Sequence, residues 1–156
     1  MGESGDVPSR IPVVLINWDA VEMTERCLER LNEHTDRSAV SICVVDNGSR
    51  DPGQVERLRA LHQQGAFDRL IRHEKNLGFP LAFNLAVADS EGELFCYVSN
   101  DCLVEPGWLA AALATMRGDE RIAVVCSNVY MREEERRPAE DREIDYLYGA
   151  IMLLRK

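Results

Sequence analysis

The chain has 156 residues, which is enough for one domain around a single hydrophobic core. Hydrophobic residues make up 46% and charged residues 29% of it, the ordinary balance of a globular domain. The formal net charge of −9 argues against a nucleic-acid partner, because polyanions bind to broad basic faces. A small phosphorylated ligand is still compatible with this charge, since a bound cation offsets it locally.

The sequence carries no signal for export or membrane insertion. Residues 1–10 are polar and lack the apolar core of a signal peptide, and no apolar run approaches the roughly 20 residues that span a bilayer. The five cysteines form no C-x-x-C pair, and four of them lie in apolar stretches, as is typical of reduced, buried thiols. We therefore expect a cytoplasmic protein without a transmembrane segment, whose residues 1–10 form a disordered tail.

Short apolar runs predict the strands of the fold. The first run, 11–17 (IPVVLIN), is rich in β-branched residues and almost entirely apolar, which is typical of a central strand buried on both faces. In chain order, the predicted strands span residues 11–17, 40–46, 67–73, 94–98 and 121–129, followed by the strand-like segment 146–156.

Four segments between these strands have helical periodicity. Asp19 and Glu22 fit a capping box at the first helix, while Asp51 and Pro52 fit the cap and the first position of the second. Strands that alternate with helices predict an α/β fold with a mainly parallel sheet. The predicted helices span residues 19–34, 51–65, 79–92 and 105–118, and the charge-dense segment 132–145 is predicted to be a loop.

Polar residues follow three of the predicted strands at their carboxyl ends. Open parallel sheets bind ligands beyond this edge, and parallel strands bring such residues together there. The coincidence of three polar strand ends therefore favours a small-ligand site. The three clusters are Asn17-Trp18-Asp19, Asp46-Asn47-Gly48-Ser49 and Ser99-Asn100-Asp101.

Each cluster taken alone has an ordinary structural explanation. The stretch 46–48 (DNG) is good turn chemistry, Asp19 is explained as a helix cap, Trp18 as a core residue, and Asp101 as the cap of the next helix. Taken together, carboxylate and amide oxygens suit Mg²⁺ or Mn²⁺, and a flat indole suits a nucleobase. The residues thus indicate a nucleoside diphosphate bound through a metal, without a P-loop or a G-x-G-x-x-G fingerprint.

Five segments in this order resemble the family-2 glycosyltransferases, which have the GT-A fold. The resemblance covers residues 11–156. It implies one GT-A-type, Rossmann-like sandwich, with a mainly parallel central sheet flanked by helices and with its C-terminal part incomplete. The segments are PVVLINWDAVEMTERCLERL, ICVVDNGSRD, HEKNLGFPLAFNLAV, GELFCYVSNDCLVEPGWL and YGAIMLLRK.

The resemblance implies a role for each matched position. The expected reaction is transfer of a sugar from a nucleoside-diphosphate sugar to the hydroxyl of a glycan, lipid-linked or small-molecule acceptor, with inversion. Asp101, at the end of a D-x-D-like motif, is implied to bind Mg²⁺ or Mn²⁺. The implied nucleotide-sugar contacts are Ile16, Asn17, Trp18, Asp46, Asn47, Asn76, Gly78, Asn84 and Asn100.

Some positions depart from the family pattern. Ser99 stands where the motif has its first aspartate. Just before Asn84, many relatives carry arginine where this chain has Phe83, which we expect to be core together with Phe79 and Leu85. The family's general base is implied to follow the GAIMLLR segment, so we assign no general base and expect the chain to be the donor-binding half.

Three hypotheses follow. The first is a metal-dependent glycosyltransferase. The second is a truncated GT-A domain that binds nucleotide or a partner chain without turnover of its own. The third is an unrelated nucleotidyltransferase or flavodoxin-like domain. A sheet that ends on the segment 146–156 would also expose an apolar edge, which predicts a homo-oligomer.

Overall fold

The computed structural model describes residues 10–128 and 149–156. The tail expected at residues 1–10 therefore lies outside the described residues except for Arg10, and the loop expected at 132–145 lies wholly outside them. In chain order the elements are β1 (Ile11–Asn17), α1 (Val21–His34), β2 (Val40–Asp46), α2 (Pro52–Gln63), β3 (Arg69–Arg72), α3 (Phe79–Ala88), β4 (Leu94–Val98), α4 (Trp108–Gly118), β5 (Val124–Cys126) and β6 (Ile151–Arg155).

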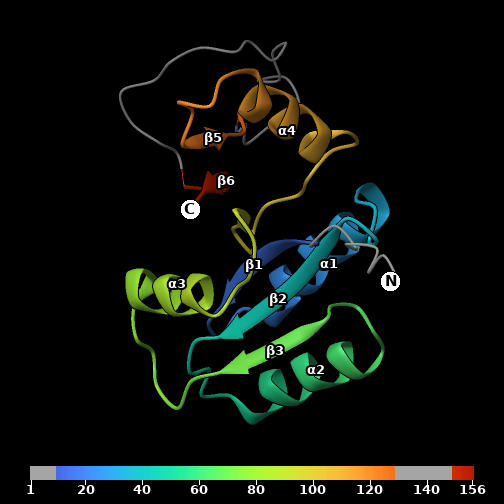
Figure 1. Ribbon diagram of the computed structural model, residues 1–156. Helices are drawn as coiled ribbons and strands as arrows, with labels where there is room; N and C mark the ends of the chain where they lie inside the picture. Colours follow the sequence, from blue (N-terminus) through green and yellow to red (C-terminus); the bar gives the residue numbers. More distant parts are fainter. Residues whose placement is uncertain (1–9, 129–148) are drawn as a thin grey trace, which may run out of the picture.

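The strands form one six-stranded sheet in the order β3-β2-β1-β4-β6-β5 (Figure 1). Strands β1 to β4 pair in parallel, whereas β6 pairs antiparallel with both β4 and β5. This confirms the mainly parallel sheet predicted from the alternation of strands and helices. Strand β6 lies between β4 and β5 and is therefore not itself an edge of the sheet, and self-association remains an untested prediction.

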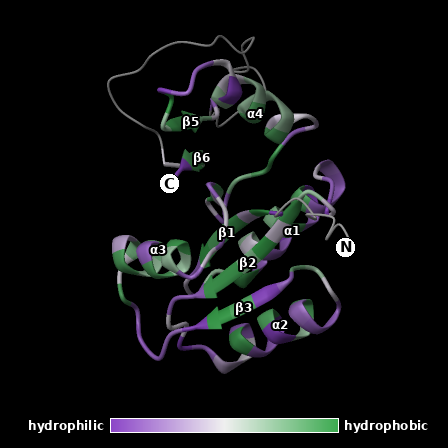
Figure 2. Ribbon diagram, viewed as in Figure 1, coloured by the Kyte–Doolittle hydropathy of each residue, from purple (hydrophilic) through white to green (hydrophobic). Residues whose placement is uncertain are grey.

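The alternation of side chains along the buried strands divides the core into two layers. Val13 and Leu15 of β1 face the larger cluster, which also takes in the buried residues of α1, α2 and α4. Val14 of the same strand faces a smaller cluster with Ala82 and Ala86 of α3. Helix α3 thus covers the opposite face of the sheet from the other three helices, and Figure 2 shows the hydrophobic strands between them.

Two predictions about helices were wrong. Phe79, Phe83 and Leu85 were expected in the core, but Phe79 and Leu85 are 44% and 45% exposed, because the small Ala82 and Ala86 take the positions against the sheet. Phe83 is half-buried, with its ring 5.7 Å from that of Phe95 in β4. Asp19 does not cap α1: its backbone is left-handed at φ 48°, and its carboxylate accepts from the backbone N of Arg50 instead. The backbone N–H of the first α1 residue is bonded by Gln54 of α2.

The predicted cap of α2 is confirmed, since Asp51 accepts a hydrogen bond from the backbone N of Gly53 at 2.8 Å. Within the described ranges, no helix is long and apolar enough to cross a membrane. All five cysteines are free thiols.

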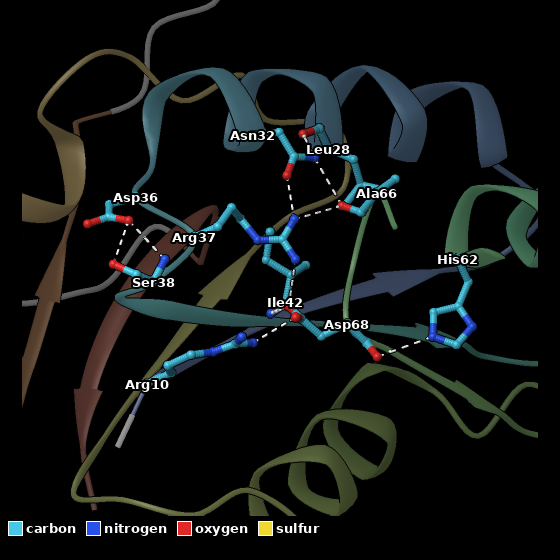
Figure 3. Close-up of polar contacts among 10 residues, drawn as sticks. All are labelled: Arg10, Leu28, Asn32, Asp36, Arg37, Ser38, Ile42, His62, Ala66 and Asp68. Carbon is cyan, nitrogen blue, oxygen red and sulfur yellow. Dashed lines mark hydrogen bonds and ion pairs between the residues drawn. The ribbon is translucent and has the colours of Figure 1, made fainter. Parts of the chain in front are cut away.

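A polar cluster that the sequence analysis did not anticipate closes the amino-terminal edge of the sheet (Figure 3). The Asp68 carboxylate accepts from Arg37 and from the backbone N of Ile42, both at 2.7 Å, and pairs with Arg10 at 2.7 Å. Arg37 also donates to the carbonyl of Ala66 at 3.1 Å. Both arginines of this cluster pair with the same carboxylate, so we assign the cluster to the stability of the fold and look for the candidate site at the opposite edge.

Candidate functional site

The carboxyl edge of the parallel strands holds the polar clusters at aligned positions. In the sheet register, Asn17 at the end of β1 lies opposite Asp46 at the end of β2, and Asp46 lies opposite Arg72 at the end of β3. Strand β2, the next strand in the chain, pairs with one side of β1, and β4 pairs with the other side. This is a topological switch point, where α/β sheets form their ligand crevices.

Asp46 is a buried carboxylate, only 1% exposed, that is held from two sides. One oxygen accepts from the backbone N of Ser49 at 3.1 Å, and the other accepts from Nε of Arg72 at 3.2 Å. A buried charge needs such partners because burial removes its hydration. The Arg72 side chain is 45% exposed, so the ion pair extends from the buried Asp46 to the rim of the edge.

Asn47 joins the turn after β2 to the turn after β3. Its Nδ2 donates to Oδ1 of Asn76 at 3.1 Å, and its Oδ1 accepts from the backbone N of Leu77 at 3.1 Å. The Asn76 oxygen also accepts from the backbone N of Gly78 at 2.7 Å, at the cap of α3. Three predicted site residues are therefore brought into one hydrogen-bonded unit.

Gly48 allows these two turns to touch. It has φ +80°, and a Cβ on it would lie 2.2 Å from the carbonyl carbon of Lys75 and 2.5 Å from the backbone N of Asn76. Both contacts are with backbone, which no side-chain rotation relieves. The glycine in the DNG stretch is thus required by a close approach of two segments as well as by the turn itself.

The turn after β4 carries Asp101 on an anchored backbone. Ser99 donates from Oγ to Oδ1 of Asp101 at 2.6 Å, and its carbonyl accepts from the backbone N of Cys102 at 2.9 Å. The backbone N of Ser99 donates to the carbonyl of Ala150 at 2.7 Å, which ties the turn to the residue before β6. The serine at the motif's first position therefore orients the carboxylate that follows it.

Two thiols lie close to this carboxylate and stay protonated at neutral pH. Burial, with a smaller contribution from the Asp101 charge, raises the pKa of Cys102 to about 11. Burial also raises the pKa of Cys27 beneath the turn to about 12. Burial therefore disfavours the thiolate form of both cysteines, and the exposed carboxylate of the turn is that of Asp101.

Trp18 and Asn84 are placed differently from the buried residues of the site. Trp18, predicted in one interpretation as core, is 49% exposed, so its indole is open to a planar ligand. Asn84 is exposed on α3 and lies two residues from both Ala82 and Ala86, which puts it on the side away from the sheet. Ile16 is half-buried against the smaller core cluster.

The described residues offer a divalent cation no ready-made cluster of ligands. Among residues 10–128 and 149–156, no three His, Cys, Asp or Glu side chains come together to hold a metal ion. Asp101 is exposed and lies at the strand-end edge, with one oxygen taken by Ser99. Mg²⁺ and Mn²⁺ are commonly held by one or two carboxylates together with substrate phosphates and water, and this donor set fits that mode.

A separate groove of about 400 Å³ runs beside α3 and is lined mainly by apolar residues, among them Val45, Ile71 and Leu85. Its lining does not suit a diphosphate, so the polar strand ends remain the candidate site.

Two residues that hold the site together, Thr24 and Arg72, were missed in the sequence, and Ser49 was named only as part of a polar strand end. Thr24 is fully buried on α1, among the apolar residues that give the helix its periodicity, so no local pattern distinguishes it. Arg72 is one residue before the end of the predicted third strand, and only the sheet register places it opposite Asp46. The one usable signal was the spacing of Ser49, three residues after Asp46, at which an aspartate side chain can accept a backbone N–H as a helix cap does.

The comparisons with known proteins agree with this architecture. The model of the family described as glycosyl transferase family 2 matches residues 13–154, and the chain belongs to that family. Its fold is the GT-A fold of a mannosyltransferase from Pyrobaculum calidifontis, PcManGT, in complex with GDP-Man and Mn²⁺. That similarity has a TM-score of 0.76 at 18% identity, over 94% of this chain and 44% of that one.

Two further glycosyltransferases are similar to this chain. S. aureus TarS 1-349 in complex with UDP-GlcNAc matches with a TM-score of 0.63 at 20% identity, over 79% of this chain and 36% of that one. Glycosyltransferase AglE of Haloferax volcanii is 27% identical over 111 residues, which cover 69% of this chain and 36% of that protein. The chain spans less than half the length of each of these relatives.

Proposed function

We propose that this chain binds the donor of a glycosyltransferase reaction, in which a sugar passes from a nucleoside diphosphate to an acceptor hydroxyl with inversion. One observation carries the proposal. Three polar strand ends meet at the switch point, and they combine an exposed indole, a hydrogen-bonded amide pair and an exposed carboxylate. Family membership and GT-A relatives whose complexes hold GDP-Man or UDP-GlcNAc support it.

The proposed roles follow from exposure and hydrogen bonding. The indole of Trp18 stacks on the base, and the Asn47–Asn76 unit lines the nucleotide. Asp46 is buried, so it acts by holding the turn after β2 and by orienting Arg72 toward the ligand. Ile16, Asn17, Gly78 and Asn100 shape the backbone around the nucleotide, and Asn84 remains a proposed contact from α3.

Asp101 is the proposed ligand of Mg²⁺ or Mn²⁺, and Ser99 orients its carboxylate. A metal bound there would neutralise the negative charge that develops on the diphosphate as the sugar leaves, typically worth several kcal/mol in the transition state. We propose no general base. The acceptor class, whether glycan, lipid-linked or small molecule, and the cytoplasmic location are likewise proposals from the family resemblance and composition.

The alternative is a domain that binds nucleotide, alone or with a partner chain, without turnover of its own. Nucleotide binding without transfer or hydrolysis of a donor sugar would distinguish it from the transferase.

Thermal unfolding in the presence of UDP, GDP or dTDP, each with and without Mn²⁺, tests the donor site. A ligand at 100 times its dissociation constant stabilises by about 2.7 kcal/mol. For a domain of this size that corresponds to a rise of roughly 5–10 °C, at about 2–4 °C per kcal/mol. We expect such a metal-dependent rise with one nucleotide.

The variant Asp101→Asn keeps the shape of the side chain and removes its charge, and we expect it to abolish the metal-dependent part of the rise. Asp36→Asn is the matched control, because Asp36 is an exposed carboxylate before β2, at the opposite edge of the sheet. A rise that survives in Asp101→Asn as in the control would remove Asp101 from the metal site. The absence of any rise in the unaltered chain would overturn the proposed function.

A further inference from the structure

Thr24 is a fully buried hydroxyl at the centre of the candidate site. Its Oγ1 donates to Oδ1 of Asn17 at 2.8 Å and accepts from Nδ2 of Asn100 at 3.0 Å. These contacts join α1 to the ends of β1 and β4, across sequence separations of 7 and 76 residues. A second acceptor, the carbonyl of Ala20 four residues earlier in the chain, lies at 3.2 Å.

The hydroxyl works as a connector because it has one proton and two lone pairs. The proton goes to Asn17, the nearer acceptor, and a lone pair receives the amide of Asn100. The chain of bonds continues, since Nδ2 of Asn17 donates to Oγ of Ser49 at 3.1 Å. The backbone N of Asp19 donates to the same Ser49 oxygen at 2.9 Å.

This chain of bonds connects the two halves of the proposed site. At one end, Ser49 belongs to the turn whose backbone holds Asp46. At the other end, Asn100 stands between Ser99 and Asp101, the residues of the proposed metal ligand. Valine would fill the same space in the helix and the core, so packing alone does not account for a threonine here.

Resting on the proposed function, we infer that Thr24 is a positioning residue that couples nucleotide binding at the ends of β1 and β2 to metal binding at the end of β4. The Thr24 hydroxyl keeps Asn100, and with it Asp101, at a set position relative to Asn17. Without the hydroxyl, the turn after β4 loses its buried link to the base-binding side. In a chain without this hydroxyl, the metal therefore tightens nucleotide binding by a smaller factor than in the unaltered chain.

Titration calorimetry measures the coupling. The ligand is the nucleoside diphosphate that stabilises the unaltered chain, and the coupling is the factor by which Mn²⁺ lowers its dissociation constant. Thr24→Val removes the hydroxyl at constant shape, and we expect it to reduce this factor about 5-fold. Thr24→Ser retains the hydroxyl, and we expect it to keep the factor within about 2-fold of the unaltered chain. A purely structural role would lower the melting temperature and leave the factor unchanged.

A second measurement needs no ligand. Urea unfolding of Thr24→Val, Asn100→Ala and the double variant forms a cycle, and we expect the effects to be clearly non-additive because both changes remove the same bond. If Thr24→Val does not fold, Asn100→Ala carries the calorimetric test, with the same reduction expected. An unchanged coupling factor, or additive effects on the free energy of unfolding, would overturn the inference alone. If the unaltered chain bound no nucleotide, the proposed function would be overturned and the inference with it.

Discussion

Gly48→Ala tests whether the close approach of two turns builds the candidate site. At φ +80° any side chain is strained by about 1–2 kcal/mol. The added Cβ would also lie 2.2 Å from the carbonyl carbon of Lys75, so one backbone segment must move. Overpacking of this kind typically costs about 1–3 kcal/mol. We expect a total loss of about 3 kcal/mol, or roughly 6–12 °C in melting temperature.

Gly65→Ala is the matched control, because Gly65 has φ +79° and nothing within 4 Å of an added Cβ. Both variants change the unfolded chain in the same way, so their difference isolates the contact with Lys75 and Asn76. We expect Gly65→Ala to lose only about 1 kcal/mol in urea unfolding and to bind nucleotide normally. Equal losses in the two variants, or normal nucleotide affinity in Gly48→Ala, would refute this reasoning.

Two further predictions concern the stability of the fold. Asp68→Ala should lower the free energy of unfolding by about 2 kcal/mol, because it removes the ion-pair partner of Arg37 and leaves the backbone N–H of Ile42 without its acceptor. The exposed Asp89→Ala should change it by less than about 0.5 kcal/mol, and similar losses in urea unfolding would contradict this reasoning. Burial raises the pKa of Cys27 from 9.0 to about 12, so the folded state holds this proton more tightly and stability falls as pH rises above about 9. Cys27→Ala should flatten the fall between about pH 9 and 11 by up to about 1.4 kcal/mol per pH unit, and parallel curves for the two proteins would argue against it.

Local patterns in the sequence sufficed to predict the strands and helices of this fold. A β-branched apolar run such as 11–17 has few alternatives to a buried strand, and Asp51-Pro52 is a helix start that local hydrogen bonding alone stabilises. Helix α3 shows the limit of this reasoning. Its sequence is apolar nearly all round, so periodicity did not distinguish the face of Ala82 and Ala86 from that of Phe79 and Leu85.

The same limit applies at Asp19. A capping box was a sound local prediction, but the carboxylate bonds the backbone N of Arg50, a residue 31 positions away. Only the packing of the turn after β2 against the turn after β1 makes that partner available. Trp18, next to it, is exposed for a related reason, since the chain leaves the sheet in a left-handed turn and does not return the indole to the core.

The sequence by itself determined the class of fold and the edge of the sheet at which polar side chains gather, because both depend on periodicity and on the order of elements along the chain. Tertiary structure alone decided the strand order β3-β2-β1-β4-β6-β5, the internal place of β6, and the partners of the buried polar groups. Thr24 illustrates the reason. Its hydroxyl bonds residues 7 and 76 positions away, and contacts over such separations depend on how strands pair, which no local pattern specifies.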